Sequence, residues 1–223
     1  MTRLVIFDLD GTLLNTIGDL AVSCNAVLAM RGLPQHSYDD YCGFVGNGIM
    51  RLVERALPEP LRTEFTISAV RRDFIEYYTA NIDTYTNPYE GIPELVSALS
   101  KQGVALAVAS NKFQAGTEKL IARFFPDILF AAVLGQRPDV PLKPDPAIVN
   151  EIINITGVAR EDILYVGDSA VDMQTAHAAG VRGVGCSWGF RSRAELEAEM
   201  PFAIIDRPSK LIDYVLDNIC QLQ

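Results

Sequence analysis

The stretch LVIFDLDGTL at residues 4–13 sets the expectation for the fold of this chain. It opens with the apolar run Leu4 to Phe7, which ends at Asp8. A run of this length is too short for a membrane span or for the core of a signal peptide, whereas it suits a buried β-strand. Asp8 and Asp10 are therefore expected at the carboxyl end of a buried strand, where two carboxylates are costly to ionise without a cation.

Short apolar runs like this one recur along the chain, and helical patterns follow most of them. The further strands are expected at residues 104–109, 131–134, 163–166, 183–187 and 203–205. Amphipathic stretches between them predict helices at residues 93–101, 117–124, 147–155 and 170–179. This alternation predicts an α/β fold, a Rossmann-like parallel sheet core with helices on both faces.

One interval interrupts the alternation. Residues 17–84 have a mostly helical pattern, with helices expected at 20–29, 49–57 and 69–80, and a single crossover between strands needs far fewer residues. We therefore expect an inserted α-helical cap domain at residues 16–86 and an α/β core domain formed by residues 1–15 and 87–223. The two connections, near Asn15 and near residues 86–88, are expected to act as hinges.

Composition and charge narrow the class of protein. The 223 residues are 49% hydrophobic, which is typical of a folded domain, and the formal net charge of -9 argues against a nucleic-acid partner. The four cysteines contain no C-x-x-C pair and indicate thiols in a reducing compartment rather than a disulfide framework or a zinc site. We expect a cytoplasmic protein with no membrane partner, and the sequence carries no signal for its oligomeric state.

Polar side chains follow several of the expected strands. Besides the two acids after the first strand, they are Ser110, Asn111, Lys143, Asp168 and Asp172. The carboxyl ends of parallel strands share one edge of a sheet, so these groups are expected to gather there. Oxygen ligands without thiol or imidazole indicate a hard cation, Mg²⁺, while a lysine and a small hydroxyl donor suit phosphate.

Taken singly, some of these residues have ordinary structural explanations. An aspartate after a strand is often a helix N-cap, which applies to Asp168, and Lys112 and Lys143 could be solvated loop charges. Ser110 and Asn111 also favour turns. The pair Asp8 and Asp10 has no such explanation, because two carboxylates at one buried strand end serve no structural purpose.

Four motifs occur in order at residues 8–13, 110–111, 143–144 and 167–173, and together they resemble those of the haloacid dehalogenase superfamily. With the helical insertion and the segments 45–48 and 52–57, the chain is most similar to the phosphoglycolate phosphatase-like branch. Asn15 is a departure, because many members have an acid shortly after the first motif. That position takes no part in the family's chemistry, so the departure concerns the hinge.

The resemblance implies phosphoryl transfer through an aspartyl-phosphate. Asp8 would be the nucleophile, Asp10 the general acid and base, and Lys143 would stabilise Asp8 and the phosphoryl oxygens. The implied metal site, for Mg²⁺, consists of Asp8, Asp10 through its backbone carbonyl, Asp168 and Asp172. The implied phosphate-binding residues are Gly11, Thr12, Ser110 and Asn111. In the cap, the flexible loop Gly46, Asn47 and Gly48 is our candidate for contact with the rest of the substrate.

The expected function is therefore a Mg²⁺-dependent phosphatase of small phosphorylated metabolites, with 2-phosphoglycolate as the best single substrate. A phosphosugar mutase, a pyrophosphatase or a nucleotidase of the same superfamily remain alternatives. Phosphonate cleavage through a cap lysine is disfavoured, because the first lysine is Lys101. A receiver-like phosphoacceptor domain would have neither the helical insertion nor a use for Asp10.

Overall fold

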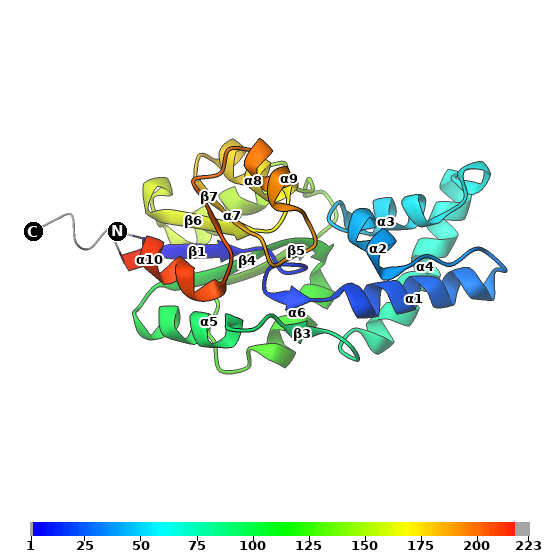
Figure 1. Cartoon of the computed structure of the whole chain (residues 1–223), viewed down its shortest axis with the longest axis horizontal. Coiled ribbons are helices and arrows are strands. Elements are labelled where there is room, and N and C mark those ends of the chain that lie inside the picture. Colours follow the sequence, from blue (N-terminus) through cyan, green and yellow to red (C-terminus); the bar gives the residue numbers. More distant parts are fainter. Residues whose placement is uncertain (1, 217–223) are drawn as a thin grey trace, which may run out of the picture.

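The computed structural model describes residues 2–216 of the chain and contains a six-stranded parallel sheet (Figure 1). Its strands, in spatial order, are β5 (Ala132–Gln136), β4 (Ala105–Phe113), β1 (Leu4–Phe7), β6 (Ile163–Gly167), β7 (Arg182–Cys186) and β8 (Ala203–Ile205). β1 pairs with β4 on one side and with β6 on the other, so it is central and buried on both faces. The predicted parallel α/β sheet is confirmed.

Helices cover both faces of this sheet. They are α5 (Ile92–Lys101), α6 (Gln114–Phe124), α7 (Ala147–Thr156), α8 (Ala170–Ala179), α9 (Arg193–Ala198) and α10 (Leu211–Leu216). Successive side chains of a strand point to opposite faces. Leu4 and Ile6 accordingly pack with the apolar side chains of α7 and α8, whereas Val5 and Phe7 join the cluster that contains those of α5, α6 and α10.

A helical segment separates the first strand from the rest of the core. β2 (Leu14–Asn15) pairs antiparallel with β3 (Asn87–Pro88), and the chain between them forms α1 (Ile17–Met30), α2 (Tyr38–Phe44), α3 (Gly48–Ala56) and α4 (Glu64–Asn81). This segment, residues 16–86, is called the cap below, and it lies beyond the carboxyl ends of the sheet strands (Figure 1). Helix α2 is absent from the sequence prediction; a capping box between Ser37 and Asp40 starts it.

One buried carboxylate joins the two connections to the cap. Asp19, in the first turn of α1, is 1% exposed and accepts hydrogen bonds from the backbone N–H of Tyr85, from the backbone N–H of Thr86 and from the Thr86 hydroxyl. The donor residues directly precede β3. The entry to the cap and its exit are therefore held together by Asp19 as well as by the β2–β3 pair.

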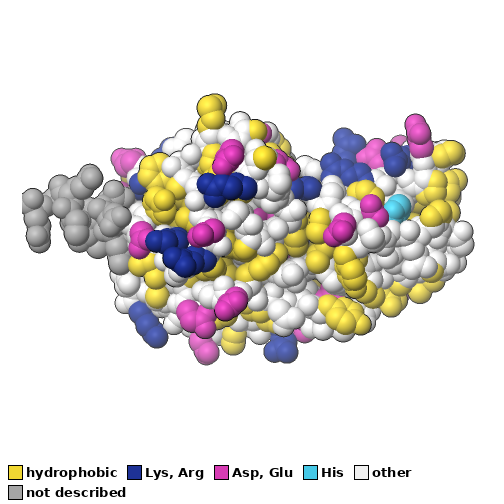
Figure 2. Space-filling model, in the orientation of Figure 1, with side chains coloured by type: hydrophobic (Ala, Val, Ile, Leu, Met, Phe, Trp, Pro, Cys, Tyr) yellow, Lys and Arg dark blue, Asp and Glu magenta, His cyan; other side chains and the backbone are white. Residues whose placement is uncertain are grey.

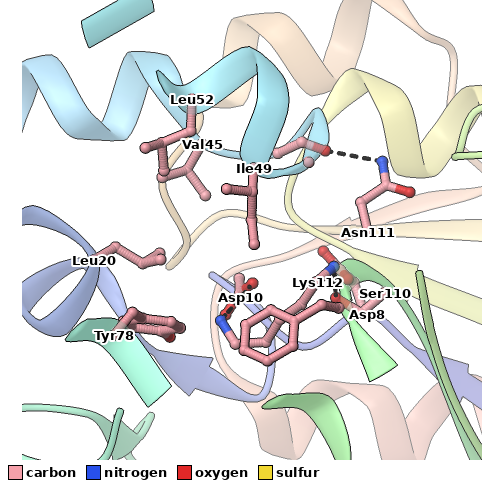
Figure 3. A pocket seen from close by; sticks show the side chains of 13 residues that line it. Asp8, Asp10, Leu20, Val45, Ile49, Leu52, Tyr78, Ser110, Asn111 and Lys112 are labelled. Atoms are coloured by element: carbon pink, nitrogen blue, oxygen red, sulfur yellow. Dashed lines mark hydrogen bonds and ion pairs between the residues drawn. The ribbon is translucent and has the colours of Figure 1, made fainter. Parts of the chain in front are cut away.

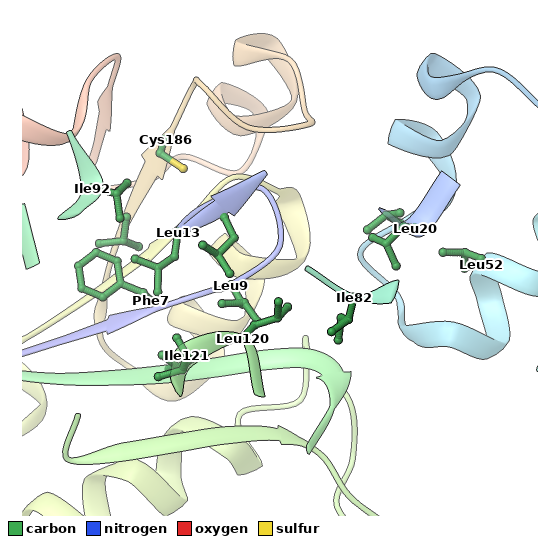
Figure 4. Close-up of a cluster of buried hydrophobic side chains, with 14 of the residues drawn as sticks. Phe7, Leu9, Leu13, Leu20, Leu52, Ile82, Ile92, Leu120, Ile121 and Cys186 are labelled. Atoms are coloured by element: carbon green, nitrogen blue, oxygen red, sulfur yellow. The ribbon is translucent and has the colours of Figure 1, made fainter. Parts of the chain in front are cut away.

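The apolar core is continuous from the sheet into the cap. One cluster contains Phe7 and Leu9 of the core together with Leu20, Leu52 and Ile82 of the cap, and Figure 4 shows the first two beside the sheet and Leu20 and Leu52 beside the cap helices. Burial of this kind contributes about 25 cal/mol for each Å² of apolar surface removed from water. The cap is therefore packed onto the core in this structure.

Figure 2 shows Lys and Arg side chains dispersed among Asp and Glu on the face in view, without a continuous basic surface there. Among residues 2–216, no helix combines the length and the apolar character that a membrane crossing requires.

Candidate active site

A pocket lies between the carboxyl ends of the sheet strands and the cap (Figure 3). The core contributes Asp8, Asp10, Ser110, Asn111, Lys112 and Phe113 to its lining. The cap contributes Leu20, Val45, Gly46, Gly48, Ile49, Leu52 and Tyr78. Polar groups that were predicted to gather at one edge of the sheet therefore form one wall, and largely aliphatic cap side chains form the other.

Three buried carboxylates form a cluster next to this pocket. One oxygen atom each of Asp8, Asp168 and Asp172 lies within 4.8 Å of the others. Burial raises the pKa of Asp8 from 3.8 to about 7; the neighbouring carboxylates of Asp172 and Asp10 add to the rise, and Lys143 opposes it. Burial also raises the pKa of Asp168 well above its usual range, with Asp172 and Asp8 adding to it. Without a cation, ionising the whole cluster is unfavourable.

Lys143 is the cation that the protein itself supplies to this cluster. Its Nζ lies 2.9 Å from Asp8 Oδ1 and 2.7 Å from Asp172 Oδ1, and it also donates to the Tyr165 hydroxyl at 2.9 Å. Burial alone would lower the pKa of Lys143, but the carboxylates of Asp172 and Asp8 raise it well above its usual value. Lys143 is thus a buried, charged lysine in contact with the predicted nucleophile, and the solvated-loop explanation for it is wrong.

Asp168 is oriented by the loops around it. Its carboxylate accepts hydrogen bonds from the Thr12 hydroxyl at 3.4 Å and from the backbone N–H of Phe190 at 2.7 Å. A Cβ on Gly11, whose φ is +89°, would lie 2.4 Å from Asp168 Oδ2, so only glycine allows this approach. The N-cap explanation for Asp168 is wrong, because Ser169 caps α8 and forms a capping box with Asp172.

The donor set of the cluster fits Mg²⁺. At metal–oxygen distances of 2.0–2.1 Å, opposite ligands of an octahedral Mg²⁺ are about 4.2 Å apart, close to the span of the three carboxylates. All three donors are oxygens, and small side-chain movements would bring them to that spacing. The side chain of Asp10 is not part of the cluster, and its predicted contribution was through the backbone carbonyl.

Asp10 faces the pocket from a different direction, and its partner is Lys112. Lys112 Nζ donates to both carboxylate oxygens of Asp10, at 2.9 Å and 3.2 Å. The side chain of Lys112 is only 2% exposed. The solvated-loop explanation for Lys112 is therefore wrong, because this lysine is a buried partner of Asp10.

Ser110 and Asn111 belong to β4 rather than to a turn, because β4 continues to Phe113 with a shift in its register against β5 after Ala109. Ser110 is 2% exposed and lies beside Asp8 in the pocket (Figure 3). The Asn111 side chain accepts from the backbone N–H of Lys143 at 2.9 Å and donates to the carbonyl oxygen of Gly46 at 3.0 Å. Asn111 therefore connects the lysine loop to the cap.

The three residues of the predicted cap loop, 46–48, do not all lie at the pocket. Gly46 and Gly48 line the pocket, with φ angles of +110° and +79°, which glycine adopts readily. Asn47 is absent from the lining that the described residues form, and its side-chain oxygen accepts a hydrogen bond from Arg55 at 2.9 Å. The structure thus brings two of the three predicted loop residues to the pocket.

Sequence reasoning missed the segment that follows β7. Trp188 Nε1 donates to the carbonyl oxygen of Thr12 at 3.1 Å, and Phe190 binds Asp168 through its backbone. The next residue, Arg191, donates to the carbonyl oxygens of Cys42 and Val45 in the cap. The position of this segment directly after a sheet strand could have identified it, since strand ends at this edge carry the other site residues.

This arrangement suits attack on a phosphorus atom. Asp8 offers a carboxylate oxygen at the pocket, Lys143 and a bound cation can offset the charge of a phosphate, and Asp10 lies on the pocket side where a leaving group would sit. A carboxylate nucleophile with a second carboxylate able to exchange protons can form and then hydrolyse a covalent acyl phosphate.

Comparisons with known proteins agree with this chemistry. The sequence model of the haloacid dehalogenase-like hydrolase family matches residues 5–186. Phosphoglycolate phosphatases of Haemophilus influenzae and Aquifex aeolicus are 32% and 31% identical to this chain, covering 99% and 97% of it and 96% and 97% of their own lengths. The crystal structure of a predicted phosphoglycolate phosphatase from Haemophilus somnus has a TM-score of 0.89 at 32% identity and covers 96% of this chain and 97% of its own.

Proposed function

The chain belongs to the haloacid dehalogenase-like hydrolase family and is a phosphoric monoester hydrolase, and we propose that its reaction is the Mg²⁺-dependent hydrolysis of 2-phosphoglycolate to glycolate and phosphate. We take the substrate from the relatives, which are phosphoglycolate phosphatases and match this chain over nearly its full length. The observation that carries the reaction is the contact of 2.9 Å between Lys143 and Asp8, beside two further carboxylates.

In the first step, a carboxylate oxygen of Asp8 attacks the phosphorus atom, and the bond from phosphorus to the ester oxygen breaks. The departing glycolate oxygen takes a proton from Asp10. Lys143, the hydroxyl of Ser110 and the backbone N–H of Asn111 would stabilise the negative charge on the phosphoryl oxygens, whereas the N–H of Gly11 already donates to the carbonyl oxygen of Leu14 at 2.9 Å. In the second step, a water molecule gives a proton to Asp10 and attacks phosphorus, which releases phosphate and restores Asp8.

Asp8, Asp168 and the backbone carbonyl of Asp10 would hold Mg²⁺, with Asp172 supporting the metal or its waters. When bound, the ion offsets the charge of the phosphate and of the buried carboxylates and polarises the phosphoryl oxygens. Hydrogen bonds from the Phe190 N–H and the Thr12 hydroxyl orient the carboxylate of Asp168, which would serve as a ligand of the ion.

We further propose that residues 16–86 act as a cap domain that opens to admit substrate and closes to exclude water. Leu20, Ile49 and Leu52 cover the pocket from the cap side (Figure 3). Closure of the cap over the substrate would favour a small phosphate ester over a nucleotide or a phosphoprotein. The proposal includes a reducing, cytoplasmic location, since Cys24, Cys42 and Cys186 are free thiols; Cys220 lies outside the described residues.

The test is phosphate release from a set of esters in Mg²⁺, compared by kcat/KM. We expect 2-phosphoglycolate to exceed hexose phosphates, nucleotides and pyrophosphate by at least about 10-fold, and chelation with EDTA to abolish turnover of all of them. A preference for pyrophosphate or nucleotides, or conversion of a hexose phosphate to its isomer without phosphate release, would replace this function with one of the superfamily alternatives. A single labelling of Asp8 without turnover would indicate a receiver-like phosphoacceptor.

A further inference from the structure

Lys112 and Tyr78 form a polar corner in the part of the pocket that faces the cap. Lys112 Nζ contacts both oxygens of Asp10 and lies 4.8 Å from the centre of the Tyr78 ring. An ammonium group has three N–H donors, and within the described part of the chain Nζ has no hydrogen-bond acceptor besides the Asp10 carboxylate. One donor therefore remains for a ligand.

Tyr78 offers a second donor at the same place. Its side chain is fully buried, and its hydroxyl finds no hydrogen-bond partner among residues 2–216. A buried hydroxyl without a partner is destabilising, and such a group in a pocket indicates a partner that arrives with the ligand. Figure 3 shows Tyr78 at the cap side of the pocket, with Asp10 and Lys112 next to it.

The rest of this part of the pocket is aliphatic. Leu20, Val45, Ile49 and Leu52 surround the corner, and of the side chains that line the pocket in the described chain, Lys112 is the one cation. A negative group on the substrate beyond the phosphate would meet no other positive charge there. Burying such a group against aliphatic side chains alone would be strongly unfavourable.

The position of the corner relative to Asp10 determines how large the leaving group can be. In the proposed reaction, Asp10 protonates the ester oxygen, so that oxygen and Lys112 Nζ lie on two sides of one carboxylate. Each contact spans about 2.7–3.0 Å. A carboxylate separated from the ester oxygen by a single carbon therefore comes within reach of Lys112, while a longer chain would have to fold back.

We propose that Lys112 and the Tyr78 hydroxyl bind the carboxylate of a short phosphorylated hydroxy acid, Lys112 supplying charge and Tyr78 a hydrogen bond. This inference rests on the proposed phosphatase function and assigns the residues that select its substrate. Lys112 keeps its contact with Asp10 and uses its remaining N–H for the substrate. Both residues are specificity determinants and act on the part of the substrate that is released.

The experiment compares two esters that differ only in this group, 2-phosphoglycolate and 2-hydroxyethyl phosphate, in wild type and in Lys112→Met. The quantity measured is the ratio of their kcat/KM values, because any loss through Asp10 or through stability affects both esters and cancels. A hydrogen bond to a charged group corresponds to a factor of about 10–150. We expect the ratio to fall by at least about 10-fold, chiefly through a higher KM for 2-phosphoglycolate, and Lys112→Arg to restore part of it.

Tyr78→Phe supplies a second variant that removes no hydrogen bond from the free protein. We expect its stability to be unchanged or higher and the ratio to fall by about 2- to 10-fold. The matched controls are Lys101→Met, at an exposed lysine of α5, and Tyr85→Phe, at an exposed tyrosine of the cap. Both should leave the ratio within about 2-fold of wild type.

The outcomes separate this inference from the function on which it rests. If the wild type hydrolyses neither ester in Mg²⁺, the proposed function fails. If the wild type hydrolyses 2-phosphoglycolate and the ratio stays unchanged in Lys112→Met and in Tyr78→Phe, the phosphatase stands and the carboxylate site is refuted. Equal losses on both esters in Lys112→Met would assign Lys112 to positioning Asp10 alone.

Discussion

Removing the charge of Asp8 should stabilise the metal-free protein, and increasingly so as the pH rises. Burial raises the pKa of Asp8 from 3.8 to about 7. One pKa unit corresponds to about 1.4 kcal/mol, so the ionised carboxylate lowers the free energy of unfolding by about 4 kcal/mol once the pH exceeds 7. The sign follows from linkage, because the folded state binds the proton of Asp8 more tightly than the unfolded state does. The stability that the protonated Asp8 contributes is therefore fully present below pH 3.8 and is lost as the pH rises through 7.

Asp8→Asn has no charge to lose, and its free energy of unfolding should exceed that of wild type by about 2 kcal/mol at pH 5 and about 4 kcal/mol at pH 8. The measurement is urea denaturation of both proteins after removal of divalent ions with EDTA, at pH 5, 6, 7 and 8. The increase in this stability difference from pH 5 to pH 8, about 2 kcal/mol, is the quantity of interest. Asp127→Asn, at an exposed acid of the core, is the control and should shift the curve equally at every pH.

If the difference in free energy of unfolding between Asp8→Asn and wild type were the same from pH 5 to pH 8, the reasoning would be refuted. Such a result would mean that the Asp8 carboxylate is not costly to ionise in the metal-free site. The argument that these carboxylates require a cation would then lose its energetic basis. Adding Mg²⁺ should reverse the order, since an ion that binds only the folded state stabilises it in proportion to its affinity. The wild type should gain more from Mg²⁺ than Asp8→Asn does.

Three further predictions follow from the same geometry. Asp10→Asn should lower kcat for 2-phosphoglycolate by about 10² to 10⁴-fold, while Asp8→Asn abolishes turnover; near-normal rates for Asp8→Asn would indicate a water nucleophile. Asp19→Ala should lower the free energy of unfolding in urea by about 2–4 kcal/mol, because the N–H and hydroxyl of Thr86 lose their buried acceptor, and an unchanged midpoint would contradict this. Gly48→Val places a branched side chain at a φ of +79° and should impair hydrolysis of 2-phosphoglycolate more than hydrolysis of an aryl phosphate. Equal losses on the two esters would show that this loop does not determine substrate specificity.

The sheet and the position of its site could be predicted because both depend on short-range patterns. β1 and β6 are buried on both faces, so each reads as an uninterrupted apolar run, and a polar residue directly after it marks the strand end. Parallel strands place all such ends at one edge. Asp8, Asp168 and Lys143 could therefore be grouped from the sequence, although more than 130 residues separate the first from the last two.

The environment of Lys112 could not be predicted, because it depends on contacts that are distant in the sequence. Its carboxylate partner, Asp10, lies 102 residues earlier, and its aromatic neighbour, Tyr78, comes from the cap. A lysine beside a strand end is usually solvated, whereas this one is buried against Asp10 and the ring of Tyr78. Helix α2 was missed for a related reason: it has seven residues, and of these only Tyr41 is buried.

The segment after β7 connects the acidic cluster to the cap. Phe190 donates its backbone N–H to Asp168, and the adjacent Arg191 donates to the carbonyl oxygens of Cys42 and Val45 at 2.8 Å and 2.7 Å. These carbonyls lie at the carboxyl end of α2, where a positive charge is favourable. In the proposed opening of the cap, water would replace both bonds, so their net contribution is small and closure would be reversible. Apolar contacts and exchangeable hydrogen bonds thus hold the cap, and this combination is the one that the proposed closure over substrate and release of product requires.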